Sequence, residues 1–210
     1  MIRAVVFDLG GVLVRIHHTW EAAARSVGIS GGAPLGRLAS YAPLSDYQGG
    51  TLLESAYLAT LAKDLGCSIE EADRVHAAIL GADYPGAEQL VLELKAQGLP
   101  TLCLSNTNEL HYKEFFGGRF PICNALDHLI ASHRIGANKP AAEAFQAIQD
   151  LLAPGEGEVI FFDDHPGNVA GAVEFGWVAK QIDPGDETGA DPVAQMRTHL
   201  VEAGVLPTHP

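Results

Sequence analysis

The chain has 210 residues, and its 26 acidic residues outnumber 13 basic ones to give a formal charge of −13. Proteins that hold nucleic acid by its phosphate backbone carry clustered Lys and Arg, so this balance argues against a nucleic-acid partner. Hydrophobic residues make up 47% of the chain, which argues against a disordered protein and predicts a folded core. A small anionic substrate stays compatible with the charge, because a few basic groups and a metal ion set the potential inside one cleft.

The cysteine content and the N-terminal segment bear on the cellular compartment. Cys67, Cys103 and Cys123 form no CxxC pair, and an odd number of thiols fits a reducing cytoplasm. The first residues form an apolar strand pattern and not a signal peptide, and no apolar run is long enough to cross a membrane. We therefore expect a cytoplasmic protein without a membrane partner, while the sequence gives no indication of its oligomeric state.

Short apolar runs alternate with helical patterns along most of the chain. Strands are predicted at residues 2–7, 101–104, 128–131, 159–162 and 177–182. Helices are predicted at residues 86–97, 108–116, 141–152, 168–175 and 192–203. Apolar strands alternating with helices at this spacing are typical of βαβ units. The sequence therefore predicts an α/β fold, a doubly wound parallel sheet with helices on both faces.

Residues 15–84 interrupt this alternation. They contain helical patterns at 19–27, 52–65 and 69–80 and no convincing strand, which indicates a helical cap inserted into a core of residues 1–14 and 85–210. The segment 30–50 is rich in Gly, Pro and Ser, and it is interpreted as a loop between cap helices or a flexible lip over the site.

Polar residues follow the predicted strands, at the edge where ligands bind to open parallel sheets. These residues are Asp8, Ser105, Asn106, Asp163 and Asp164, and Lys139 stands before the predicted helix at residues 141–152. Each alone is compatible with an ordinary turn or helix cap. The adjacent carboxylates of Asp163 and Asp164 would repel each other unless a cation or hydrogen-bond donors compensate. Taken together, the set predicts a magnesium site and the charge-neutralising groups that phosphoryl transfer requires.

In these motifs the chain resembles the haloacid dehalogenase superfamily of hydrolases, whose core is Rossmann-like. The four matching motifs are residues 5–13, 104–106, 139–140 and 161–164, and the resemblance covers essentially the whole chain. The cap lies between the first motif and the second strand, as in the helical-cap subgroup. Residues 104–111 and 161–164 look most like the sugar-phosphate phosphatases and the phosphatase domain of soluble epoxide hydrolases.

The resemblance implies a role for each motif residue. Asp8 would be the nucleophile and form an aspartyl-phosphate, while Ser105 and Asn106 would hold the phosphoryl group. Lys139 would neutralise Asp8 and the substrate. The implied Mg²⁺ ligands are Asp8, Asp164 and the carbonyl of Gly10, with Asp163 as an indirect or alternative ligand. The implied partner is a small-molecule phosphate ester.

The chain departs from the family pattern at Gly10, where phosphatases of the family usually carry an acid/base aspartate, although the sugar-phosphate phosphatase relatives that it resembles also carry Gly there. A missing general acid costs about 10²- to 10⁴-fold in rate if nothing replaces it. We favour a phosphatase whose leaving group needs little protonation, such as a sugar 1-phosphate or an acyl phosphate. Two alternatives are a 2-haloacid dehalogenase, in which halide leaves without a proton, and a non-catalytic protein that binds phosphate and Mg²⁺.

Histidines and a tryptophan near the motifs are further candidates. His17, His18 and Trp20 lie where the chain enters the cap and could touch substrate, although His17 and His18 are equally compatible with a polar helix entry. His165 follows the two aspartates and could carry a proton, although a histidine in a surface turn is the better interpretation.

Overall fold

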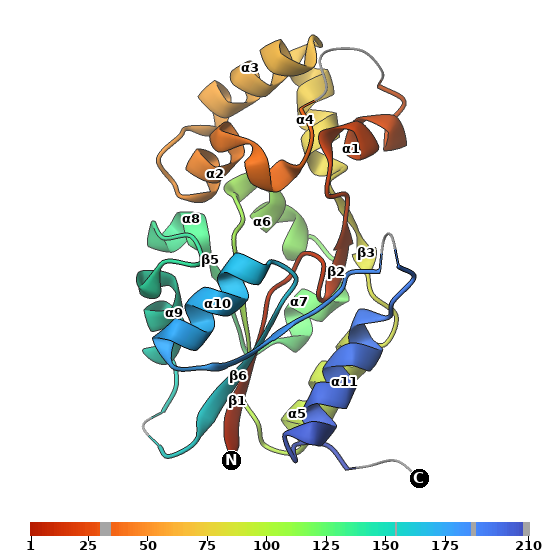
Figure 1. Cartoon of the computed structure of the whole chain (residues 1–210). Coiled ribbons are helices and arrows are strands. Elements are labelled where there is room, and N and C mark those ends of the chain that lie inside the picture. The colour runs from red at the N-terminus through yellow and green to blue at the C-terminus, as the bar shows by residue number, and fades with distance from the viewer. Residues whose placement is uncertain (30–34, 154, 186–187, 208–210) are drawn as a thin grey trace.

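A five-stranded parallel sheet forms the centre of the computed structural model, which describes residues 1–29, 35–153, 155–185 and 188–207 (Figure 1). The strand order is β5-β4-β1-β6-β7. The bounds are β1 Ile2–Phe7, β4 Thr101–Ser105, β5 His128–Ala131, β6 Glu158–Asp163 and β7 Val178–Gln181. All four pairings are parallel. The predicted fold class, a doubly wound α/β sheet, is confirmed.

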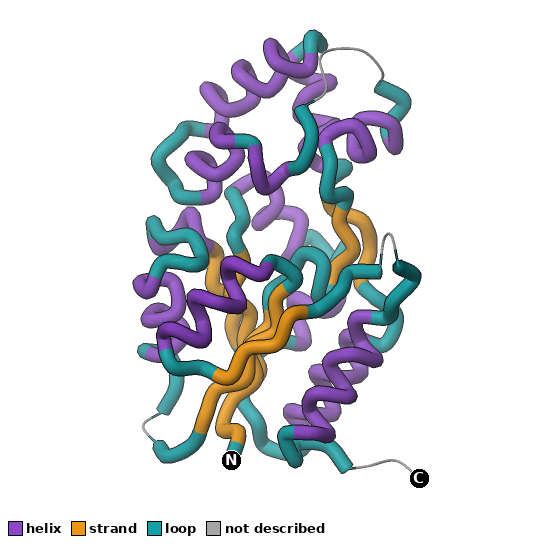
Figure 2. The backbone as a smooth tube through the Cα atoms, in the orientation of Figure 1, coloured by secondary structure: helices purple, strands orange, loops and turns teal. Residues whose placement is uncertain are grey.

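Helices cover both faces of this sheet (Figure 2). The side chains of β1 alternate, so that Val5 and Phe7 pack in one apolar cluster and Ala4 and Val6 in another, all fully buried. The first cluster includes residues of α5 and α11, and the second includes residues of α9 and α10. The bounds of these helices are α5 Ala87–Ala96, α9 Ala142–Gln149, α10 Pro166–Phe175 and α11 Pro192–Glu202. A strand buried on both faces explains the continuous apolar run that predicted β1.

Three further helices belong to the connections of the sheet. Their bounds are α6 Glu109–Phe115, α7 Pro121–Ala125 and α8 Ser132–Ile135. The sequence predicts α6, but α7 and α8 were not predicted, because helices of five and four residues are too short to show a periodic pattern. No helix in the described ranges is long and apolar enough to cross a membrane.

A group of helices within the predicted cap segment lies above the carboxyl ends of the strands (Figure 1). The bounds are α1 Trp20–Ser26, the 3-10 helix η1 Leu38–Ser40, α2 Ala42–Gln48, α3 Glu54–Leu65 and α4 Ile69–Ala77. These helices share a hydrophobic cluster of their own, in which Trp20, Tyr57 and Leu61 are fully buried. Because this cluster is separate from the two clusters at the sheet, we treat the helices as a cap with its own core.

Two predictions for the cap segment were wrong. The short strands β2 Val14–Ile16 and β3 Leu80–Asp83 pair as an antiparallel ribbon where the chain enters and leaves the cap, and no strand was predicted there. Their pairing joins residues more than 60 positions apart, which no local pattern reveals. Helix α2 occupies part of the segment 30–50 that was interpreted as a loop, although Pro43 in its first turn is a favourable helix start. Residues 30–34 of that segment lie outside the described residues.

A buried polar network joins the cap to the core. His76 of α4 bonds through Nδ1 to the Tyr57 hydroxyl at 2.8 Å and through Nε2 to Asn108 Oδ1 at 3.1 Å. His111 of α6 stacks on His76 with ring centroids 4.1 Å apart and bonds through Nε2 to the His76 carbonyl at 2.9 Å. Burial lowers the pKa of His111 to about 4 and holds the pKa of His76 well below its usual value. Both rings are therefore neutral in the folded protein near pH 7.

This network predicts a loss of stability in acid. The unfolded chain binds protons on both histidines below about pH 6.5, whereas the folded chain does not, so the free energy of unfolding falls as the pH drops from 7 towards 4. The contribution of His111 is roughly 2 kcal/mol by pH 5. Urea unfolding at pH 7.5 and 5.0 measures it, and we expect His111→Gln to shrink the difference while His128→Gln, on an exposed strand residue, leaves it unchanged. An unaltered pH dependence in His111→Gln would contradict this account.

Candidate active site

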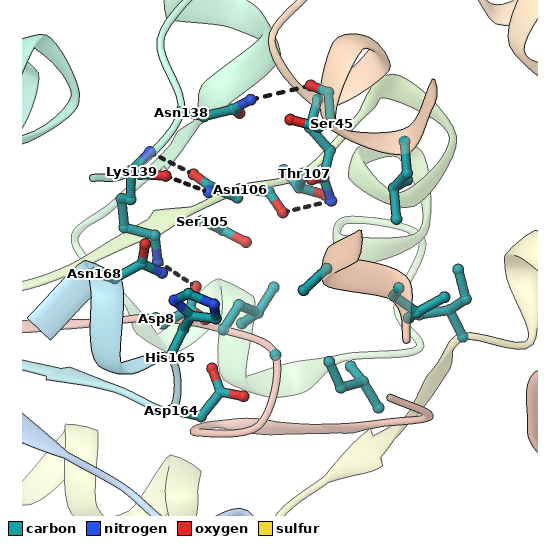
Figure 3. Close-up of a pocket in the computed structure, with 18 of the residues that line it drawn as sticks. Asp8, Ser45, Ser105, Asn106, Thr107, Asn138, Lys139, Asp164, His165 and Asn168 are labelled. Atoms are coloured by element: carbon teal, nitrogen blue, oxygen red, sulfur yellow. Dashed lines mark hydrogen bonds and ion pairs between the residues drawn. The ribbon is translucent and has the colours of Figure 1, made fainter. Parts of the chain in front are cut away.

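A cavity of about 640 Å³ lies between the carboxyl ends of the strands and the cap (Figure 3). The sequence-predicted residues that line it are Asp8, Gly10, Ser105, Asn106, Lys139 and Asp164. Asp163 lies behind them, fully buried, and joins the group through Lys139. The structure therefore brings together all seven of these motif residues, from segments more than 150 positions apart in the chain.

The ammonium of Lys139 is the centre of the site. Its Nζ lies 2.7 Å from Asp8 Oδ1 and 2.7 Å from Asp163 Oδ2, and it donates to the Leu104 carbonyl at 2.7 Å. Burial alone would lower the pKa of Lys139, but the charges of Asp163 and Asp8 outweigh it and raise this pKa above the usual value. Lys139 is therefore a permanent cation with three acceptors, one from each of β1, β4 and β6.

The two adjacent aspartates have different surroundings. Asp163 accepts hydrogen bonds from the His165 amide at 2.8 Å and from Asn168 Nδ2 at 3.0 and 3.1 Å, in addition to the ion pair with Lys139. The side chain of Asp164 is 19% exposed and lines the cavity. Asp163 thus has its oxygens occupied by protein donors, while Asp164 faces the place where a ligand would enter.

The turn after β1 is built for a close approach of Asp164. Gly11 has a φ of +79°, and an added Cβ would lie 2.9 Å from the carboxyl carbon of Asp164. A side chain at this position would be strained and would push Asp164 away. Glycine therefore allows Asp164 to pack directly against the loop that carries Asp8 and Gly10.

The donor set fits a magnesium ion. Carboxylate oxygens of Asp8, Asp163 and Asp164 lie within 4.8 Å of one another, and full ionisation would place three negative charges beside one ammonium. Burial raises the pKa of Asp164 to about 8, with further contributions from the charges of Asp8 and Asp163, and burial raises the pKa of Asp8 to about 6. A divalent cation with oxygen ligands would relieve this excess of negative charge.

Ser105 is the last residue of β4, and Asn106 follows it. Ser105 is 5% exposed and lines the cavity beside Asp8. The side chain of Asn106 is engaged with the backbone of Lys139, because its Nδ2 donates to the Lys139 carbonyl at 3.0 Å and its Oδ1 accepts from the Lys139 amide at 2.8 Å. Asn106 therefore fixes the loop that carries Lys139, a contribution that the sequence did not reveal (Figure 3).

Helix α2 of the cap bonds directly to these loops. Gln48 Nε2 donates to the Asn106 carbonyl at 3.0 Å, and Asn138 Nδ2 donates to the Ser45 carbonyl at 3.0 Å (Figure 3). The Ser132 hydroxyl donates to the Gln48 carbonyl at 2.7 Å. Sequence reasoning missed these cap residues because the segment was interpreted as a loop, and its docking on the core depends on tertiary contacts.

Of the remaining histidine and tryptophan candidates, only some line the cavity. His18 lines the cavity, and its Nδ1 lies 3.9 Å from Asp164 Oδ2. His165 also lines the cavity and accepts a hydrogen bond from the Gly167 amide through Nδ1, so it caps α10. Trp20 is fully buried in the cap cluster and is not a lining residue, so the structure does not support the possible substrate contact for it. His17 is not a lining residue either.

Comparisons with known proteins agree with this geometry. Residues 2–176 match the model of the haloacid dehalogenase-like hydrolases. The phosphatase MT3486 of Mycobacterium tuberculosis (strain CDC 1551 / Oshkosh) is 29% identical over 197 residues, which cover 89% of this chain and 90% of that protein.

Solved structures share the fold at lower identity. A wild-type HAD family enzyme from Bacteroides thetaiotaomicron, in complex with magnesium and inorganic phosphate, is 20% identical with a TM-score of 0.69 and covers 90% of this chain and 98% of its own. The L-2-haloacid dehalogenase from Xanthobacter autotrophicus, with chloropropionic acid covalently bound, is 20% identical with a TM-score of 0.62. The match covers 99% of this chain and 85% of the dehalogenase chain. Phosphate-binding and dehalogenating enzymes thus both occur among the structural neighbours.

The different surroundings of the two aspartates predict different responses to magnesium. Saturating Mg²⁺ should raise the melting temperature by roughly 5 to 10 °C. Asp164→Asn should abolish this rise and stabilise the metal-free protein, since it removes a carboxyl group whose ionisation is disfavoured by burial and by the charges of Asp8 and Asp163. Asp163→Asn should destabilise the metal-free protein, since Lys139 loses an ion pair, and should keep part of the response. Thermal unfolding with Mg²⁺ or EDTA measures both, and the opposite pattern would make Asp163 the direct ligand.

Proposed function

The chain belongs to the haloacid dehalogenase-like hydrolase family, and from this premise we propose that it is a magnesium-dependent phosphatase of small phosphate esters, such as sugar phosphates. The observation that carries the proposal is the pairing of Asp8 with Lys139 at 2.7 Å, inside a carboxylate cluster that fits Mg²⁺. The phosphatase relative and the neighbour that binds magnesium and phosphate support it.

In the proposed reaction, a carboxylate oxygen of Asp8 attacks phosphorus and the ester bond breaks, which leaves an aspartyl-phosphate and a free alkoxide or alcohol. Lys139 offsets negative charge on Asp8 and on the phosphoryl oxygens, and Ser105 with the Asn106 loop positions the phosphoryl group. Water then cleaves the aspartyl-phosphate and regenerates the Asp8 carboxylate. Bound Mg²⁺, held by Asp8, Asp164 and the Gly10 carbonyl with Asp163 behind them, would supply further neutralisation of the phosphoryl charge.

Gly10 determines which leaving groups this chemistry can serve. An added Cβ at Gly10 would lie 3.2 Å from both Cδ1 and Cγ2 of Ile16, so a side chain at this position would have to displace the Ile16 side chain by a few tenths of an ångström. The leaving oxygen therefore receives little help with its proton from this position. An acidic leaving group, as in an acyl phosphate or a sugar 1-phosphate, suits such a site best.

Two other functions fit parts of the site. In a 2-haloacid dehalogenase, halide would leave without a proton, which is consistent with Gly10, and a solved dehalogenase shares the fold. The cluster of three carboxylates favours the phosphatase, because carbon–halogen cleavage by Asp8 needs no cation. A non-catalytic protein that binds phosphate and Mg²⁺ would retain the same cluster without turnover.

A substrate screen tests the proposal against both alternatives. We expect phosphate release from phosphomonoesters or acyl phosphates with Mg²⁺, its loss in EDTA, and a fall of at least about 10³-fold in Asp8→Asn. Mass spectrometry after brief exposure to an active substrate should show a transient phosphate adduct on Asp8. Metal-independent halide release from short 2-haloacids would instead identify a dehalogenase, and binding of Mg²⁺ and phosphate without turnover would identify the binding protein.

The crowding at Gly10 predicts the outcome of restoring the acid. Gly10→Asp alone should fit poorly against Ile16, so the useful variant is Gly10→Asp with Ile16→Ala, compared with Ile16→Ala as its control. We expect the double variant to raise kcat about 10-fold or more for alkyl phosphates and much less for acyl phosphates, since only poor leaving groups need the proton. Steady-state kinetics over a series of leaving groups measures this. An equal gain across the series would refute our explanation of Gly10.

A further inference from the structure

The imidazole of His111, in the first turn of α6, is held where the cap meets the core. Its Nε2 lies 2.9 Å from the carbonyl oxygen of His76, which is in the last turn of α4 and also accepts from the Ile79 amide at 3.1 Å. The backbone amide of His111 donates to Asn108 Oδ1 at 3.1 Å, and its ring stacks on the ring of His76. The orientation of the His111 ring is therefore fixed by contacts on both sides.

The contact with the His76 carbonyl decides which nitrogen of the His111 ring carries the proton. A carbonyl oxygen only accepts hydrogen bonds, so Nε2 must be the protonated nitrogen. The ring is neutral near pH 7, because burial lowers the pKa of His111 to about 4. Nδ1 therefore has a lone pair and no proton, and it acts as a hydrogen-bond acceptor only.

This acceptor is available to a ligand. In the part of the chain that the structure describes, Nδ1 of His111 makes no hydrogen bond with the protein. Two other unpaired nitrogens, Trp20 Nε1 and Asn108 Nδ2, are sealed from solvent, but Nδ1 of His111 is not among the sealed atoms. The residue is only 5% exposed and lines the cavity, so the surface that Nδ1 retains faces the cavity. A ligand that supplies a donor would relieve an acceptor that otherwise lacks a partner.

The surroundings of this acceptor favour an uncharged donor. Phe115, one turn further along α6, lines the cavity together with Ile79 and Leu80, where the chain leaves the cap. Arg119 donates to the Leu80 carbonyl at 2.6 Å, and its charge contributes to the low pKa of His111. A ligand ammonium would lose its water among these apolar side chains and would meet the charge of Arg119. A hydroxyl group is the donor that fits.

From these features we propose that Nδ1 of His111 accepts a hydrogen bond from a hydroxyl of the leaving group. In the proposed reaction the phosphoryl group lies at the strand ends, so the leaving group extends into the rest of the cavity, whose lining includes His111. The preferred substrates are then phosphate esters of sugars or other polyols, and His111 selects one of their hydroxyls. This inference rests on the proposed phosphatase function and specifies its substrate class.

Substrate analogues test the inference in the unaltered protein. Glucose 1-phosphate is compared with its deoxy and deoxyfluoro analogues at each ring hydroxyl in turn, and glycerol 3-phosphate with propyl phosphate. Loss of the selected hydroxyl should lower kcat/KM about 10- to 100-fold, and fluorine should not restore it, because fluorine cannot donate a hydrogen bond. Recovery with fluorine, or no preference for any hydroxyl in either series, would overturn the inference.

Two variants separate hydroxyl recognition from the structural role of the His111 ring. The amide of Gln reaches as far as Nε2 and can donate to the His76 carbonyl, but it puts no acceptor at the place of Nδ1. The amide oxygen of Asn lies near the place of Nδ1, but Asn loses the contact with His76. We expect His111→Gln to abolish the preference for the hydroxylated substrate and His111→Asn to retain part of it. The reverse order would assign His111 a structural role only and would make the inference wrong.

The comparison uses the ratio of kcat/KM between the members of each substrate pair, so that differences in intrinsic reactivity cancel between the variants. The matched control is His128→Gln, on an exposed residue that does not line the cavity. It should leave the ratio as in the unaltered protein. A ratio that falls as much in His128→Gln as in His111→Gln would contradict the inference.

Binding measurements separate this inference from the function on which it rests. Calorimetry with Mg²⁺ compares 3,4-dihydroxybutylphosphonate with butylphosphonate, and we expect tighter binding of the dihydroxy ligand, which His111→Gln removes. Such differential binding without turnover of any ester would overturn the phosphatase and keep the hydroxyl site. Turnover with equal effects of His111→Gln on hydroxylated and deoxy substrates would overturn the hydroxyl site and keep the phosphatase. Neither differential binding nor turnover would overturn both.

Discussion

The site depends on the contacts that the buried ammonium of Lys139 makes with its acceptors. Removing an ammonium group from water is costly, and only good partners offset that cost. Lys139 is 4% exposed and has three acceptors, from the ends of β1, β4 and β6. These are neighbouring strands of the sheet, so one charge ties together the strand ends that carry Asp8, Ser105 and Asp163. The loss of any acceptor would leave a buried charge partly unpaired, so the geometry has little freedom to relax.

The contacts around Lys139 hold its loop in position. Asn106 bonds to both polar groups of the Lys139 backbone, and Asn168 at the start of α10 bonds to both oxygens of Asp163. Gly171 lets α10 approach closely, because an added Cβ there would lie 2.6 Å from Cβ of Pro140. The helix that supports Asp163 thus also packs against the residue after Lys139. The contacts that hold Lys139 and Asp163 in position are therefore also contacts that pack α10 against the loop of Lys139.

The core and its predicted site residues could be found from sequence because the signals are local. Each strand is an apolar run that ends in a polar junction, and parallel strands place those junctions at one edge. The structure of the cap was harder to predict from the sequence. The ribbon β2–β3 and helix α2 depend on pairing with distant segments, so Ser45 and Gln48 carried no signal. The different roles of Asp163 and Asp164 also needed coordinates, because adjacent residues after a strand face opposite sides and only the fold decides which side holds Lys139.

In the proposed function, the core and the cap would contact different parts of the substrate. In the proposed reaction, Asp8, Lys139 and the carboxylate cluster would act on the phosphoryl group, which is the same in every phosphate ester. The leaving group would then meet Ile16, which comes from the ribbon that leads into the cap and lies 3.2 Å from the position of an added Cβ at Gly10. Because an aliphatic side chain donates no proton, the leaving oxygen of the substrate would have to be acidic enough to depart without one. Selectivity for acidic leaving groups would then arise from the ribbon that joins the cap to the core, before any side chain of the cap helices contacts the substrate.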